Sequence, residues 1–228
     1  MARLHVLRVF CAEDGTGGNP LGVFLDGSEV EESERQGVAA ELGFSETVFV
    51  DDRDRAELRI FTPEIEMQLA GHPLVGTAWL LGEEGAKPDV LRPPAGETPV
   101  RFEAELSFVA ARVEWAPPID FVEVDSPAEV DALSGPPAGY EGEVGVWSWI
   151  DEPKGEIRER VFFPAAGIPE DEATGIAALR LCAELGGRPI QIRQGVEAGS
   201  LIFARPYEPD PAMVEIGGRV ALDEIREH

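Results

Sequence analysis

The stretch Arg59-Ile-Phe-Thr-Pro63, followed by Gly71-His-Pro-Leu-Val-Gly-Thr-Ala78, decides the fold because it returns in the second half of the chain. The second copy reads Arg160-Val-Phe-Phe-Pro164 and then Asp171-Glu-Ala-Thr-Gly-Ile-Ala177. In both copies a β-rich run ends at proline, a loop follows, and an apolar helix opens on a polar residue four positions before a glycine. Strand–proline–loop–helix is a common arrangement, but the joint agreement in order, spacing and residue type favours an internal duplication.

The duplication predicts two similar halves related by a pseudo-twofold axis, residues 1–116 and 117–228, with the boundary at Pro117-Pro118. Helices predicted over 72–81 and 172–185 are apolar enough to be buried, each inside the sheet of its own half. Their N-termini would face each other across a cleft. Unpaired N–H groups and partial positive charge at those ends suit a substrate carboxylate.

Strand-like runs outnumber helices in the rest of the chain. A further helix is expected over 33–42, ended by Gly43, and residues 214–223 are expected to form a strand pair that can pack back on the first half. Residues 112–115 also have strand character. Many strands with few helices predict an α+β fold rather than a doubly wound α/β sheet.

Composition excludes several classes of function. The 228 residues are 43% apolar, which is enough for a sizeable core, but 19 Lys+Arg against 44 Asp+Glu give a net charge of −25. Phosphate backbones and anionic lipid surfaces would repel such a chain, so no nucleic-acid or membrane partner is expected. No apolar run approaches a membrane span, and Arg8 interrupts the first one, which predicts a cytoplasmic protein.

Cysteine and histidine are scarce. Cys11 and Cys182 lie far apart in apolar surroundings and form no CxxC pair, so two buried free thiols are expected. With only three histidines, the chain has too few ligands in any local spacing for a structural zinc site. Nucleophile-elbow, P-loop, HExxH and dinucleotide-binding patterns do not occur. If the protein is an enzyme, acid/base chemistry without metal or cofactor remains.

Three side chains are candidates for that chemistry. Glu46 stands at the mouth of an apolar strand, where its carboxylate is either exposed at the edge or desolvated with the raised pKa that an acid/base needs. His72, at a helix start, could donate a hydrogen bond, shuttle a proton, or simply serve as a capping or core histidine. Asp171 could be an ordinary N-cap, and only its match with His72 suggests more.

Six sequence blocks, in order, resemble the signatures of the PhzF-like family of phenazine biosynthesis: Gly18-Asn-Pro20, Gly43-Phe-Ser-Glu-Thr-Val-Phe-Val50, Arg59-Ile-Phe-Thr-Pro63, Ala70-Gly-His-Pro-Leu-Val-Gly-Thr-Ala78, Glu170-Asp-Glu-Ala-Thr-Gly175 and Gln194-Gly-Val-Glu-Ala-Gly199. The resemblance implies a diaminopimelate-epimerase-like fold, with two halves that are each a curled, mostly antiparallel sheet around a central helix. It also implies an active site between the halves and a homodimer.

The resemblance further implies roles for individual residues. Glu46 would be the acid/base, and His72 and Asp171 would line the substrate site. Related epimerases carry two cysteines at the helix starts, so this chain resembles the cysteine-free isomerase branch. Seven other residues of the matching blocks would contact a small carboxylate substrate: Asn19, Ser45, Gly71, Thr174, Gly175, Gln194 and Gly195.

The sequence also departs from the family pattern. The second half is shortened between Pro118 and Val144, Glu172 replaces a small residue or proline, and Ile176 replaces a serine. These changes leave the substrate open. The expected function is a PhzF-like isomerase that moves a proton by means of Glu46. The alternatives are a protein that binds a small acid without turnover, and an epimerase or racemase with Asp171 as the second acid/base.

Overall fold

The computed structural model describes residues 2–164, 168–197 and 199–228. The first 116 residues contain the helices α1 (Arg35–Leu42) and α2 (Gly71–Glu83) and the strands β1 (Arg3–Cys11), β2 (Asn19–Phe24), β3 (Glu46–Asp52), β4 (Glu57–Phe61), β5 (Glu66–Met67), β6 (Val90–Leu91), β7 (Thr98–Glu103) and β8 (Leu106–Arg112). The later residues contain α3 (Pro127–Asp131), α4 (Gly175–Glu184), β9 (Asp120–Glu123), β10 (Val144–Asp151), β11 (Glu156–Phe163), β12 (Ile168–Asp171), β13 (Ile190–Gln194), β14 (Ser200–Pro206) and β15 (Met213–Glu227).

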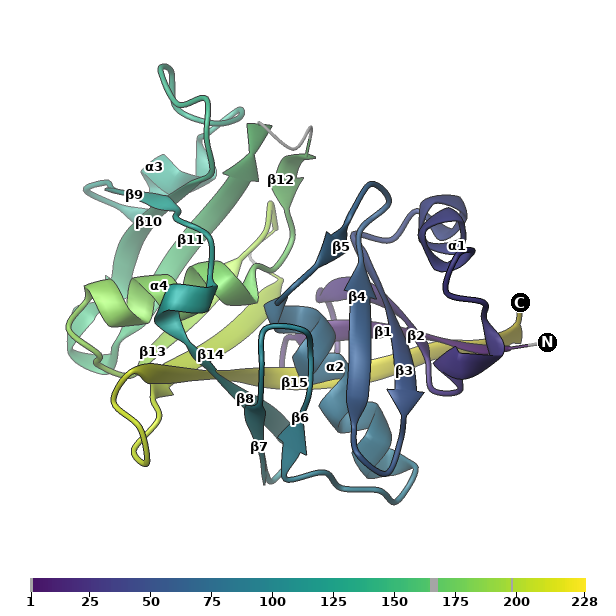
Figure 1. The fold of residues 1–228 in the computed structure, drawn as a ribbon. Coiled ribbons are helices and arrows are strands. Elements are labelled where there is room, and N and C mark those ends of the chain that lie inside the picture. Colours follow the sequence, from purple (N-terminus) through teal and green to yellow (C-terminus); the bar gives the residue numbers. More distant parts are fainter. Residues whose placement is uncertain (1, 165–167, 198) are drawn as a thin grey trace.

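The two halves repeat one order of elements. In the first half β2 runs parallel to β3 with α1 between them in the chain, and β4 and β5 continue antiparallel before α2 begins. In the second half β9 runs parallel to β10 with α3 between them, and β11 and β12 continue antiparallel before α4. Figure 1 shows the halves side by side, each curled around its helix. The predicted α+β fold of two similar curled halves is confirmed, whereas the boundary at 116/117 stays a prediction.

Both central helices are buried, as their apolar sequences predict. In α2 every residue from Gly71 to Ala78 is buried, and in α4 every residue from Gly175 to Leu179. The predicted start of the second helix at residue 172 is wrong. Asp171 pairs with Val161 as the last residue of β12, so its backbone is extended, and Thr174 is the N-cap. Asp171 is therefore not a helix cap.

The strand pair predicted over 214–223 is also wrong, because these residues form part of one long strand. The first part of β15 pairs with β14 and β8, and its second part pairs with β1. In Figure 1 it runs as one long yellow ribbon from the second half, on the left, across the first half to the C-terminus on the right. Residues 112–115 likewise differ from expectation: β8 ends at Arg112 and Val113–Trp115 form a 3-10 turn.

The two cysteines, Cys11 and Cys182, are buried and free, as predicted. Over the described ranges of the chain, none of the helices combines the length and the apolar character that crossing a lipid bilayer requires.

Candidate active site

The N-termini of the two central helices meet at their first residues. A Cβ atom on Gly71 would lie 2.7 Å from the Cα of Gly175, so the backbones are in direct contact. Neither N-cap residue, Ala70 or Thr174, caps its helix through a side chain. The first N–H groups of both helices therefore lie close together and can bind an anionic or carbonyl oxygen.

Glu46 is the first residue of β3 and lies beside this junction. Strand alternation places it on the same face as Val48 and Val50, toward the main core. Its side chain is 17% exposed, and Oε2 lies 3.4 Å from Nε2 of His72. Burial raises the pKa of Glu46 to about 7, although the nearby Ser45 hydroxyl lowers it. Of the two positions that the sequence left open, the structure shows the desolvated one.

His72 is buried in the first turn of α2. Burial lowers its pKa to about 4, so the ring is neutral near pH 7 and its contact with Glu46 is not an ion pair. The ring hydrogen-bonds the backbone carbonyl of Pro20, which can only accept. In a neutral imidazole one nitrogen donates and the other accepts, and Nε2 has no hydrogen-bond partner in the described residues. Nε2 is therefore the acceptor, and it faces the Glu46 carboxyl.

Asp171 lies across the junction from Glu46, and each of its oxygens accepts a hydrogen bond. Asn19 Nδ2 donates to Oδ1 at 2.7 Å, and the Thr174 hydroxyl donates to Oδ2 at 2.6 Å. Burial, and then the charge of Glu46, raise the pKa of Asp171, while these two donors lower it. The donors favour the ionised form of Asp171, whereas the Glu46 carboxyl has fewer donors to stabilise its charge.

Asn19 and Ser45 link the two carboxyl groups. Asn19 is buried, and besides Asp171 its Nδ2 donates to the Ala173 carbonyl at 3.1 Å. Its Oδ1 accepts the Ser45 hydroxyl at 3.1 Å, one residue before Glu46. Gln194, fully buried on β13, accepts a hydrogen bond from the Thr174 N–H and donates one to the Thr174 hydroxyl. The structure thus brings Glu46, His72, Asp171, Asn19, Ser45, Gly71, Thr174, Gly175 and Gln194 together.

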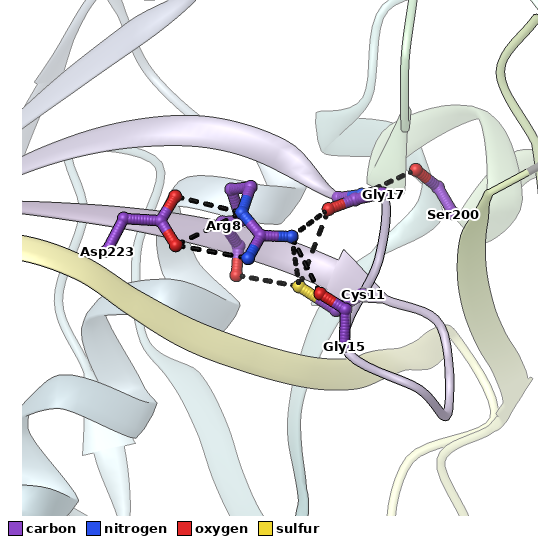
Figure 2. A network of polar contacts seen from close by, with 7 residues as sticks. Arg8, Cys11, Gly15, Gly17, Ser200 and Asp223 are labelled. Carbon is purple, nitrogen blue, oxygen red and sulfur yellow. Dashed lines mark hydrogen bonds and ion pairs between the residues drawn. The ribbon is translucent and has the colours of Figure 1, made fainter.

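Arg8 binds the glycine-rich loop before Asn19 through hydrogen bonds to its backbone carbonyls. Figure 2 shows its guanidinium between the Asp223 carboxylate, at 2.8 Å, and the carbonyls of Gly15 and Gly17, at 2.8 and 2.6 Å. The next amide, Gly18 N–H, donates to the Ser200 hydroxyl at 3.0 Å. Arg8 therefore fixes the loop that leads into Asn19.

Gly195 differs from the other predicted substrate contacts. Its φ is +88°, and the space where a Cβ would stand is filled by the Glu172 carboxylate, at 2.3 Å. That carboxylate also accepts the Ser200 hydroxyl at 3.0 Å. Gly195 thus packs against Glu172, a residue by which this chain departs from the family pattern.

Sequence reasoning missed Glu143, the counterpart of Glu46. Thr47 pairs with Phe61 and Val144 pairs with Phe162, and the two phenylalanines hold the same place in the repeated Arg-x-Phe sequence. Glu143 therefore corresponds to Glu46, its pKa is likewise raised by burial, and its Oε2 has no partner in the described residues. Extending the internal repeat to Ser-Glu-Thr-Val-Phe-Val (45–50) and Gly-Glu-Val-Gly-Val-Trp (142–147) would have found it.

Neither a metal-binding cluster nor the cavity near the end of α2 coincides with the group around Glu46 and His72 in the described residues. Within the described residues, no group of three or more His, Cys, Asp or Glu side chains could hold a metal ion. A cavity of about 420 Å³ lies instead near the end of α2, lined by residues that include Trp79, Phe102 and Arg219. None of its lining residues belongs to the group around Glu46 and His72.

Comparison with known proteins shows the family of this chain. Residues 7–135 match the model of the family described as "Phenazine biosynthesis-like protein". A trans-2,3-dihydro-3-hydroxyanthranilate isomerase from Pseudomonas aeruginosa is 33% identical over 90% of each chain, and one from Pseudomonas chlororaphis is 32% identical over 82% of this chain and 84% of its own. A PhzC/PhzF protein of known structure from Clostridium difficile superimposes with a TM-score of 0.81 at 19% identity, covering 100% of this chain and 99% of its own. This chain therefore belongs to the phenazine biosynthesis-like family, whose relatives named here by function are isomerases.

Proposed function

We propose that this protein is an isomerase that moves a proton within a small carboxylate substrate, with Glu46 as the acid/base. The observation that carries the proposal is the Glu46 carboxyl itself, desolvated beside a neutral histidine, with a pKa raised to about 7. A carboxyl that titrates near neutrality can both take and return a proton under ordinary conditions. The names of the relatives support the class of reaction.

The steps follow from the groups present. Ionised Glu46 takes a proton from one substrate carbon, and the electron pair of the broken C–H bond moves into the adjacent unsaturated system. The first N–H groups of α2 and α4 hold the substrate carboxylate or keto oxygen. Glu46 then carries the proton. Its Oε2 lies 3.4 Å from Nε2 of His72, so a small shift would let the Glu46 O–H donate a hydrogen bond to this nitrogen. Glu46 finally returns the proton to a second carbon.

A one-base isomerase fits better than an epimerase with two bases. The only candidate that the sequence offered for the second base is Asp171, and both its oxygens already accept hydrogen bonds from Asn19 and Thr174. Asp171 is therefore better suited to hold charge than to transfer a proton.

Deuterium exchange tests the proposal. Trans-2,3-dihydro-3-hydroxyanthranilate, the compound in the relatives' names, is incubated in D2O with the parent, Glu46→Gln and the exposed control Glu41→Gln. We expect label in the product with the parent and the control, and a rate lower by roughly 10²–10⁴ with Glu46→Gln.

Two results would count against the proposal. If Glu46→Gln exchanged label as fast as the parent, Glu46 would not be the base. If the parent bound a panel of small carboxylates in calorimetry but exchanged label into none of them, the protein would be a binder of small acids without turnover.

A further inference from the structure

Gln194 is a polar residue near the site with no exposed surface. On β13 it points to the same side as Ile190 and Ile192, which belong to the main core. The expectation from the sequence was that it contacts substrate. Its hydrogen bonds give it a different role.

The orientation of the Gln194 amide is fixed by two backbone groups. Its Oε1 accepts from the N–H of Thr174 at 3.1 Å, and that group can only donate. Its Nε2 donates to the carbonyl of Asp171 at 3.1 Å, and that group can only accept. Exchanging the amide oxygen and nitrogen would break both bonds, so the assignment follows from the partners.

The second N–H of Gln194 sets the direction of the next bond. It donates to Oγ1 of Thr174 at 2.8 Å, so the hydroxyl accepts there. A hydroxyl has a single proton, and that of Thr174 is given to Oδ2 of Asp171 at 2.6 Å. The chain of bonds therefore runs one way, from Gln194 through Thr174 to Asp171.

A count of donors shows that the N–H groups of these two amides are already used within the protein. Both N–H groups of Gln194 are used within the protein, and so are both N–H groups of Asn19, which bond Asp171 and Ala173. Neither amide keeps a donor for a ligand. Their N–H groups donate instead to Asp171, Ala173 and Thr174, and the hydroxyl of Ser45, the residue before Glu46, donates to Asn19 Oδ1.

We propose that Gln194 is a positioning residue that acts on Asp171 through Thr174, by fixing the direction in which the Thr174 hydroxyl donates. The inference rests on the proposed function only where turnover is measured. With these hydrogen bonds intact, both Asp171 oxygens accept hydrogen bonds, which favours the ionised form of Asp171. Without Gln194, the Thr174 hydroxyl would be free to turn away from Asp171.

The test follows the titration of Asp171 itself. Protein with 13C-labelled aspartate carboxyls is titrated by NMR, and the Asp171 signal is assigned from its loss in Asp171→Asn. We expect Thr174→Val to raise the Asp171 midpoint by on the order of one pH unit, since a donor to the carboxylate is lost, and Thr174→Ser to leave it unchanged.

Gln194→Met should raise the same midpoint by a smaller amount, and the double variant Gln194→Met/Thr174→Val should titrate like Thr174→Val alone. Gln191→Met, on the same strand but outside the group of residues around Glu46 and Asp171, is the matched control and should change nothing. An Asp171 midpoint unaffected by Gln194→Met, or a shift that adds in full to that of Thr174→Val, would overturn the proposal.

Because Gln194 is buried, its methionine variant needs a substitute should it fail to fold. Gln194→Glu keeps an acceptor for the Thr174 N–H, and its own charge acts on Asp171 with or without the Thr174 hydroxyl. Gln194→Glu shifts the Asp171 midpoint partly by its charge and partly through the hydrogen bonds of Thr174. Only the second part of the shift disappears when Thr174→Val is also present. If no part disappears, Gln194 does not act through Thr174.

Turnover separates positioning from substrate binding. With trans-2,3-dihydro-3-hydroxyanthranilate, a positioning residue predicts that Gln194→Met lowers kcat by about 10- to 100-fold with KM little changed. A raised KM with unchanged kcat would instead make Gln194 a substrate ligand. A parent inactive on every carboxylate tried would count against the proposed function, while the NMR titration would still decide the role of Gln194.

Discussion

Gly71 and Gly175 touch backbone to backbone at the start of the two central helices. A Cβ on Gly71 would lie 2.7 Å from the Cα of Gly175, and one on Gly175 would lie 2.9 Å from the Cα of Gly71. The Cδ1 atom of Ile216 closes the same space at 2.7 and 2.8 Å. Because backbone atoms cannot move aside as the end of a side chain can, both positions need glycine.

Alanine at either position should push the helix N-termini apart. We expect Gly71→Ala and Gly175→Ala each to lower the free energy of unfolding by about 1–3 kcal/mol and to lose most turnover. Urea denaturation measures the first effect. Gly37→Ala on α1, where a Cβ would meet nothing within 4 Å, is the control and should gain about 0.5–1 kcal/mol. Alanine variants as stable as the parent would show that the contact is not tight.

The rate of proton abstraction should depend on pH through Glu46. Its ionised form is the base, and its pKa is raised to about 7, so kcat/KM should rise with pH and level off above about 7. The pKa of His72, lowered to about 4, lies outside this range. Initial rates of label exchange from pH 5 to 9 measure the profile. A rate independent of pH across that range would contradict the assignment.

Stability should fall as pH rises because of Glu159. This residue is fully buried on β11 facing Gly145, neither of its oxygens has a partner in the described residues, and burial raises its pKa from 4.5 to about 8. The folded state keeps the proton up to about pH 8, whereas the unfolded chain loses it near 4.5. Its contribution is therefore fully present below pH 4.5 and lost as pH rises through about 8, with a total of roughly a few kcal/mol.

Glu159→Gln removes this titration without changing the shape of the side chain. Urea midpoints of the variant and the parent at pH 5, 7 and 9 should diverge, with the variant gaining relative to the parent as pH rises. Glu46 titrates in both proteins, so its effect cancels in the difference. A difference that stays constant from pH 5 to 9 would mean that Glu159 does not titrate in this range.

We propose that the protein is a homodimer formed through the faces or edges of its sheet. The strong negative charge makes a large electrostatic interface unfavourable, and Leu222 and Ile225 on β15 are apolar side chains left 42% and 49% exposed. Light scattering should give twice the mass of 24.7 kDa at micromolar concentrations, and Leu222→Glu should reduce it. A parent mass of 24.7 kDa at every concentration would rule out the dimer.

Local patterns in the sequence predicted much of the fold. The all-apolar run after His72 predicted a buried helix, and the β-rich run that begins at Arg59 predicted a strand, which is β4 (Glu57–Phe61). The start of α4 was misplaced because the residues before it resemble a capped first turn. There the Asp171 carboxylate bonds Asn19, far away in the chain, which no local pattern shows. The single strand β15 was missed for a similar reason, since its partners β1 and β8 are distant in sequence.

The sequence predicted which residues form the candidate site, but not the hydrogen bonds between them. The family blocks pointed to Glu46, His72 and Asp171, and the structure brings them together. The direction of the bonds from Gln194 and Asn19 depends on which backbone groups they face, and only coordinates show that. Glu143 was missed because its repeat differs from the Glu46 block in nearly every neighbouring residue.

The path of β15 also bears on how the newly made chain reaches its fold. When residues 1–116 have left the ribosome, β1 and β8 still lack the strand that lies beside each of them, and their backbone edges stay open. Residues 213–227, which close those edges, are made about a hundred residues after β8. Closure therefore requires contacts between segments that are far apart in the chain, and such contacts form slowly. Until residues 213–227 emerge, the edges of β1 and β8 remain open to pairing with other nascent chains.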